Sequence, residues 1–115
     1  MKYLPFMFLF SIVAISVVYP IINESGNDTL WRDQGLAYYD NSQYTDALSA
    51  FHRATRINGT DDLAWTGEGY SLIQLRYYDE AITAFNKALE INPDNFSAWD
   101  GKVDATSAKY AREMN

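Results

Sequence analysis

The chain has few residues that could carry out chemistry. Its single histidine, His52, has no second histidine and no cysteine to complete a metal site or a nucleophilic pair. Two pairs of adjacent acids, at residues 61–62 and 79–80, stand where helices are expected to begin, and capping of the helix dipole explains them there. The Gly-Glu-Gly run at 67–69 lacks the lysine of a phosphate-binding loop. We therefore expect no enzyme activity, no metal site and no cofactor.

The spacing of other residues indicates an internal repeat. The three tryptophans, Trp31, Trp65 and Trp99, lie at intervals of 34 residues. Six further pairs recur at this interval: Gly35 and Gly69, Ala47 and Ala81, Phe51 and Phe85, Ala54 and Ala88, Ile57 and Ile91, Asn58 and Asn92. A fixed period of this size is typical of solenoids, in which each unit buries its apolar face against the next unit.

Within each period the apolar residues recur every three or four positions, which predicts helices. We expect helices over about 30–40, 44–57, 63–75 and 78–91, and a fifth from about residue 94 or 95 to 113. Small residues in each unit, Gly35 with Ala47 and Gly69 with Ala81, are predicted to lie where its two helices cross closely.

This pattern resembles that of the tetratricopeptide repeat (TPR) family, in which a tryptophan, a glycine and an aromatic residue precede Ala, Phe, Ala and Pro. The second unit matches it with Trp65, Gly69, Leu72, Ala81, Phe85, Ala88 and Pro93. The first unit matches it with Trp31, Gly35, Tyr38, Ala47, Phe51 and Ala54, and has Gly59 where proline is usual. The resemblance covers roughly residues 28–113.

The resemblance implies an all-α fold, a short right-handed α-solenoid. We expect two helix-turn-helix units, residues 28–61 and 62–95, followed by a C-terminal capping helix at 96–115. Val103 and Thr106 replace the glycine and the aromatic residue of the third unit, which fits a helix that covers the second unit and has no following helix to cross. Two repeats are few for a solenoid, so we expect marginal stability or self-association through the repeat edges.

In TPR proteins the first helix of each unit lines a concave groove that holds an extended peptide or a helix. The resemblance therefore implies a protein–protein interaction module, an adaptor or scaffold. The matching groove positions here are Arg32, Leu36, Tyr39, Leu63, Thr66, Tyr70, Ile73 and Gln74. We expect Tyr70 and Ile73, in the central unit, to be the strongest contacts; the alternative is that these side chains are merely exposed.

The groove composition also limits the partner. One TPR subclass grips chaperone C-terminal carboxylates with a basic clamp, but only Arg32 among the groove positions is basic, and Asp100 and Asp104 would repel a carboxylate. We expect an apolar or aromatic, neutral-to-basic segment instead. A structural subunit that self-associates through the solenoid edges, and a carrier for a polymer or small ligand, stay open as alternatives.

The N-terminal residues 1–22 are predicted to be a signal anchor, as a hydrophobic transmembrane helix, or a signal peptide, with a linker at 23–27. Residues 3–22 carry no charge, and about 20 apolar residues suffice to cross a bilayer. The length of the run and its lack of a small-residue cleavage pattern favour the anchor; cleavage followed by secretion is the alternative. Since Lys2 precedes the run and acids follow it, we expect the repeats outside the cytoplasm.

Charge excludes other partners. Residues 23–115 hold eight Lys/Arg against fifteen Asp/Glu, a formal charge of −7. An acidic domain of this kind repels nucleic acid and anionic lipid headgroups.

Four N-x-S/T sequons, at Asn23, Asn27, Asn58 and Asn95, agree with an extracytoplasmic location or arise by chance.

Overall fold

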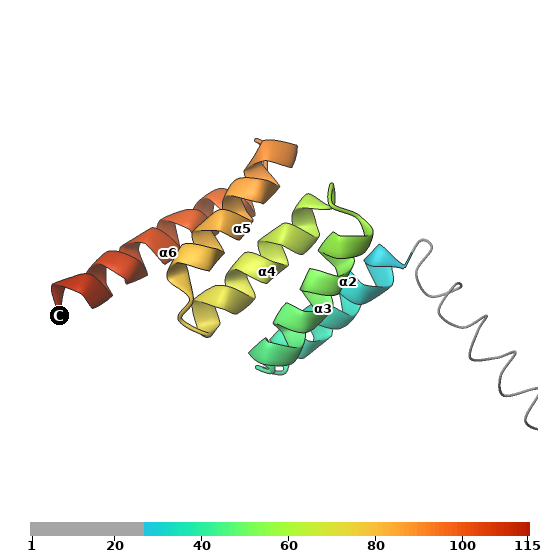
Figure 1. Cartoon of the computed structure of the whole chain (residues 1–115), viewed down its shortest axis with the longest axis horizontal. Helices are drawn as coiled ribbons and strands as arrows, with labels where there is room; N and C mark the ends of the chain where they lie inside the picture. Colours follow the sequence, from blue (N-terminus) through green and yellow to red (C-terminus); the bar gives the residue numbers. More distant parts are fainter. Residues whose placement is uncertain (1–26) are drawn as a thin grey trace, which may run out of the picture.

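The computed structural model describes residues 27–115, which form five α-helices and no strands (Figure 1). The helices are α2 (Asp28–Asp40), α3 (Tyr44–Ile57), α4 (Asp62–Gln74), α5 (Tyr78–Ile91) and α6 (Phe96–Met114). The all-α prediction is confirmed for this part of the chain, and each helix end lies within two residues of the position expected from the sequence.

The predicted N-terminal hydrophobic helix lies outside the described residues. Among the helices of residues 27–115, none combines the length and the apolar composition that crossing a bilayer requires.

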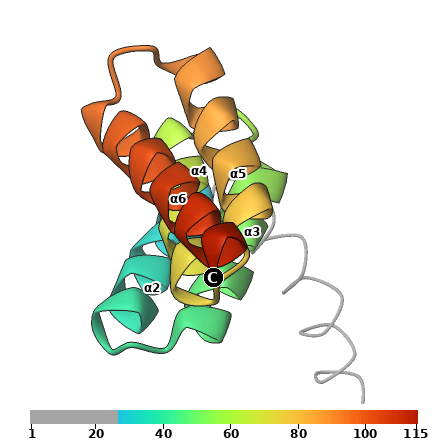
Figure 2. The same cartoon turned by 90° about the vertical axis from the view of Figure 1, so that its left-hand side faces the viewer.

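The helices stack in chain order, each antiparallel pair against the next (Figure 1). α2 packs on α3 and α4 packs on α5, and the pairs join where α4 contacts α3 and α6 contacts α5. The first helices α2, α4 and α6 also contact one another in turn, whereas the second helices α3 and α5 each pack against α4 and hardly contact each other (Figure 2). The solenoid thus has one layer of first helices and one of second helices.

Two phenylalanine rings form the centre of this stack. Phe51 on α3 is 1% exposed and Phe85 on α5 is fully buried. A Cβ on Gly35 would lie 2.8 Å from the Phe51 ring, and one on Gly69 would lie 2.6 Å from the Phe85 ring. The close crossing expected at these glycines therefore exists, and the side chain that lies against each glycine is the phenylalanine of the same unit.

A second glycine faces each ring from the following unit. Gly67 lies against the Phe51 ring and Gly101 against the Phe85 ring, each too close to accommodate a Cβ. These two glycines are also one period apart. Each phenylalanine is therefore held between a glycine of its own unit and a glycine of the next first helix.

Two polar residues begin the later first helices. Asp61 precedes α4 and accepts a hydrogen bond from the backbone N–H of Ala64 at 3.1 Å. Asn95 precedes α6 and accepts one from Ala98 at 3.0 Å. Both side chains are buried, so each helix start is fixed from within the junction between units.

Candidate interaction face

Apolar side chains that lie outside the buried core are exposed on the layer of first helices. Leu36 on α2 is 49% exposed and Leu63 on α4 is 55% exposed. Around them lie the half-buried Tyr39, Tyr70 and Ile73 and the exposed Gln74. We call these six residues the α2/α4 face. All six are among the eight groove positions that the sequence predicted.

Tyr39 and Gln74 join the two units across this face. The Gln74 amide donates a hydrogen bond to the Tyr39 hydroxyl at 3.3 Å, and the Tyr39 ring packs edge-on against Tyr44 with 5.2 Å between centroids. Burial raises the pKa of Tyr39 above its ordinary value of 10.0. The hydroxyl therefore stays protonated at neutral pH and remains a hydrogen-bond donor as well as an acceptor.

Tyr70 and Ile73 belong partly to the fold. The Tyr70 hydroxyl donates to the backbone carbonyl of Ser97 at 2.9 Å, and its ring meets Phe85 edge-on with 5.2 Å between centroids. Ile73 packs against the buried cluster of the second unit. A substitution of either residue would therefore change the packing between α4, α5 and α6 as well as the surface.

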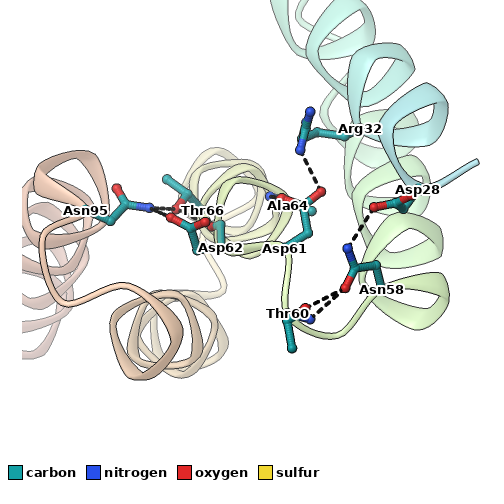
Figure 3. Close-up of polar contacts among 9 residues, drawn as sticks. All are labelled: Asp28, Arg32, Asn58, Thr60, Asp61, Asp62, Ala64, Thr66 and Asn95. Carbon is teal, nitrogen blue, oxygen red and sulfur yellow. Dashed lines mark hydrogen bonds and ion pairs between the residues drawn. The ribbon is translucent and has the colours of Figure 1, made fainter. Parts of the chain in front are cut away.

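Arg32 and Thr66, the other two expected positions, tie the units together (Figure 3). Arg32 forms an ion pair with Asp61 at 2.7 Å. Thr66 is 7% exposed; its hydroxyl donates to the Asp62 carbonyl at 2.7 Å and accepts from the Asn95 amide at 2.9 Å. Both side chains thus have intramolecular partners at the junctions, and neither is counted in the α2/α4 face.

The sequence did not reveal the role of Glu68. This residue is 9% exposed, and one carboxylate oxygen lies 3.3 Å from Nδ1 of His52. The His52 side chain itself is 59% exposed. The available signal was the change of residue type at this position of the repeat, where Gln34 and Lys102 stand one period away.

The structure also bears on metal binding and glycosylation. Within residues 27–115 no group of three or more His, Cys, Asp or Glu side chains is placed to hold a metal ion. Of the sequon asparagines, Asn95 is 7% exposed and its amide nitrogen donates to Asp62 at 2.9 Å. A glycan at Asn95 would break these contacts, so the folded unit does not present that sequon.

The repeat pattern and the helix stack match known proteins. A family model described as "Tetratricopeptide repeat" matches residues 32–96. Among solved structures, the Arabidopsis OM64 TPR domain aligns with a TM-score of 0.73 at 18% identity, covering 78% of this chain and 74% of that chain. No curated protein sequence gives a significant match.

Two further structures are of the same kind. The first TPR of Spaghetti (RPAP3), bound to the HSP90 peptide SRMEEVD, has a TM-score of 0.70 and 24% identity over 73% of this chain and 68% of that chain. The first TPR domain of human RPAP3 has a TM-score of 0.73 and 24% identity over 77% and 70%. At these identities the similarity establishes the fold.

Proposed function

Since the chain belongs to the tetratricopeptide repeat family, we propose that it is an adaptor that holds a peptide or helical segment of another protein on the α2/α4 face. TPR domains are protein-interaction modules, and the RPAP3 neighbour is a TPR bound to a peptide. The observation that carries the proposal is the exposure of Leu36 and Leu63 beside three half-buried apolar side chains. Exposed apolar side chains gathered on one face favour a protein partner.

The chemistry of the face argues for an apolar or aromatic, neutral-to-basic partner segment. The HSP90 peptide of the neighbour carries two glutamates and a C-terminal aspartate. Here Arg32 is paired with Asp61, and the next first helix adds Asp100 and Asp104, both exposed. An acidic tail would meet these carboxylates without a free basic side chain among the expected groove positions, so the preference should differ from that of the neighbour.

The pair of exposed leucines supplies the test. Leu36→Ser and Leu63→Ser should reduce partner recovery in affinity capture from solubilised membranes, followed by mass spectrometry, without lowering the melting temperature, because neither side chain is in the core. Lys87→Ser on α5, 53% exposed, is the control. Recovery that is unchanged in both leucine variants would rule out this face.

We further propose that residues 3–22 tether the module to a membrane, with the repeats outside the cytoplasm. The support is the uncharged run and the position of Lys2 before it. Alkaline extraction should leave the full chain in the membrane pellet, and protease added to intact cells should remove a C-terminal tag. Release of the chain into the supernatant would favour the alternative, secretion after signal cleavage.

A second candidate function is self-association through the end of the solenoid. Large apolar side chains are exposed along α6: Phe96, Trp99, Val103, Tyr110 and Met114. Trp99 and Val103 stand one period after Trp65 and Gly69. On α4, Gly69 lies against the Phe85 ring of α5, and Trp65 packs against the buried cluster that contains Phe85. This surface of α6 is therefore the one on which a further helix would pack, and a second copy of the chain is a candidate to cover it.

A further inference from the structure

A groove opens between the two second helices, away from the α2/α4 face. Its cavity of about 580 Å³ has walls from α3 and α5 and a floor from α4. The lining residues are Thr45, Leu48, Ser49 and His52 on α3, Trp65, Glu68 and Leu72 on α4, and Glu80, Thr83 and Ala84 on α5. Cavities of roughly 300–1,000 Å³ are the size that binds ligands in proteins.

Helical spacing explains the groove. Three residues of α4, Trp65, Glu68 and Leu72, recur at intervals of three and four and point between α3 and α5. Because α3 and α5 each pack against α4 but hardly contact each other, this stripe is not fully covered. Leu48 and Ala84 complete apolar walls at the sides.

Glu68 is the unusual member of this lining. It is 9% exposed, and within residues 27–115 its two carboxylate oxygens have only long contacts, at 3.3 Å to Nδ1 of His52 and 3.3 Å to the Thr55 hydroxyl. The Thr55 hydroxyl also lies 2.9 Å from the backbone carbonyl of His52, so its one proton cannot serve both acceptors fully. A carboxylate this buried normally has a close cationic partner, because its desolvation is costly.

The repeat itself does not require an acid at this place. The equivalent residue of the next unit, where α6 packs on α5, is Lys102, so packing of a first helix on the preceding second helix does not require an acid there. At the rim of the groove Glu80 adds a second carboxylate, which is exposed. The groove therefore combines apolar walls with negative charge at its floor and its edge.

We propose that this α3/α5 groove binds an apolar segment of a partner protein that carries a lysine or arginine. The cationic group pairs with Glu68 in a charge-assisted hydrogen bond. The methylene stem of the lysine or arginine and the apolar residues beside it in the partner cover Leu48, Trp65 and Leu72. The formal charge of −7 over residues 23–115 attracts such a segment. Leu63 and Tyr70 of the α2/α4 face lie on another side of α4, so occupation of one site leaves the other open.

The test uses the full chain, ¹⁵N-labelled in neutral-lipid nanodiscs, and two probe peptides, acetyl-Leu-Ala-Lys-Ala-Leu-amide and its glutamine analogue. The lysine peptide should shift the amide signals of His52, Glu68 and Thr83, and bind about tenfold more tightly than the glutamine peptide. Glu68→Gln should remove that preference, and Glu90→Gln, an exposed acid on α5 outside the groove, should keep it.

A second variant tests the groove without touching the charge. Ser49→Trp, on the α3 wall, should fill the cavity and abolish the shifts for both peptides. Three results would overturn the proposal: equal binding of the two peptides, shifts confined to the α2/α4 face, or unchanged binding by Ser49→Trp. A fourth is equally tight binding of n-butylammonium, which would make the occupant a free organic cation.

Discussion

At the scale of single residues, the fold depends on polar side chains that recur one period apart (Figure 3). Asn58 donates to Asp28 at 2.9 Å in the first unit, and Asn92 donates to Asp62 at 3.1 Å in the second. Each bond links the end of a second helix to the start of the first helix in its own unit. The same residue type therefore closes both units at the same place.

Asp61 combines two roles that substitution can separate. It caps α4 and holds Arg32. Asp61→Asn loses the ion pair with Arg32 but keeps a side-chain oxygen that can cap α4, as Asn95 caps α6. Asp61→Ala loses the cap as well, so it should lower the free energy of unfolding by about 1 kcal/mol more than Asp61→Asn does. Urea unfolding monitored by circular dichroism measures both; equal losses in the two variants would contradict the cap assignment.

The Asp28–Asn58 bond gives a pH-dependent prediction. The hydrogen bond from Asn58 lowers the pKa of Asp28 below its ordinary value of 3.8. Because the folded pKa is the lower one, this contribution to stability is full above the unfolded pKa and is lost as the pH falls through the folded pKa. Asn58→Ala should therefore raise the pKa of Asp28 in an NMR titration of its carboxyl carbon, while the exposed Asn41→Ala should leave it unchanged.

At the scale of the helices, the glycines mark where elements meet. Gly67 and Gly101 each face the phenylalanine of the preceding unit, and Asp33, one period before Gly67, is exposed. Within the described residues no helix precedes α2, so that position of α2 has no ring to accommodate. Glycine thus occupies this position of the repeat in the two first helices that pack against a phenylalanine ring of the preceding unit.

Gly67→Ala should destabilise the fold by about 1–3 kcal/mol, despite the better helix propensity of alanine. The new Cβ would overlap the Phe51 ring, which has little room to move because Gly35 also lies against it. Gly59→Ala is the matched control, since a Cβ there would come no closer than 3.7 Å to the Thr55 carbonyl. Thermal unfolding of the two variants measures the difference, and equal melting temperatures would refute the ring contact.

The helices and the places where they cross closely could be predicted from the sequence. The period and the spacing of apolar residues predicted the helices, and the glycine positions indicated close crossings. The partner of each glycine could not be predicted, because Gly67 and Phe51 belong to different units and only the stacking brings them together. For the same reason the sequence did not show that Thr66 is buried under Asn95, nor that Glu68 lies at the floor of a groove.

At the scale of the whole molecule, the two ends of the solenoid and its two faces differ. The α2/α4 face and the α3/α5 groove lie on different sides of α4, and α6 exposes an apolar stripe at the C-terminal end. Few repeats bury little surface between units, so stability should respond to anything that covers an end. Because α6 exposes the apolar stripe, we expect the C-terminal end to be the one whose covering changes the stability most.

Self-association through α6 predicts a concentration-dependent melting temperature for the full chain at a fixed detergent ratio. Val103→Glu should abolish that dependence without unfolding the chain, because Val103 is 61% exposed. Asp46→Glu, at an exposed site on α3, serves as the control. A monomer whose melting temperature does not change with concentration and lies well above about 65 °C would contradict both marginal stability and self-association.

A partner protein on the α2/α4 face would be detected most directly by site-specific photo-crosslinking in native membranes. With p-benzoylphenylalanine in place of Leu36 or Leu63, irradiation should give an adduct with the same partner from both positions. With the label in place of Glu90, whose side chain is 68% exposed on α5, no such adduct should form. Adducts from Glu90 alone, or none from Leu36 and Leu63, would show that the partner does not lie on the α2/α4 face.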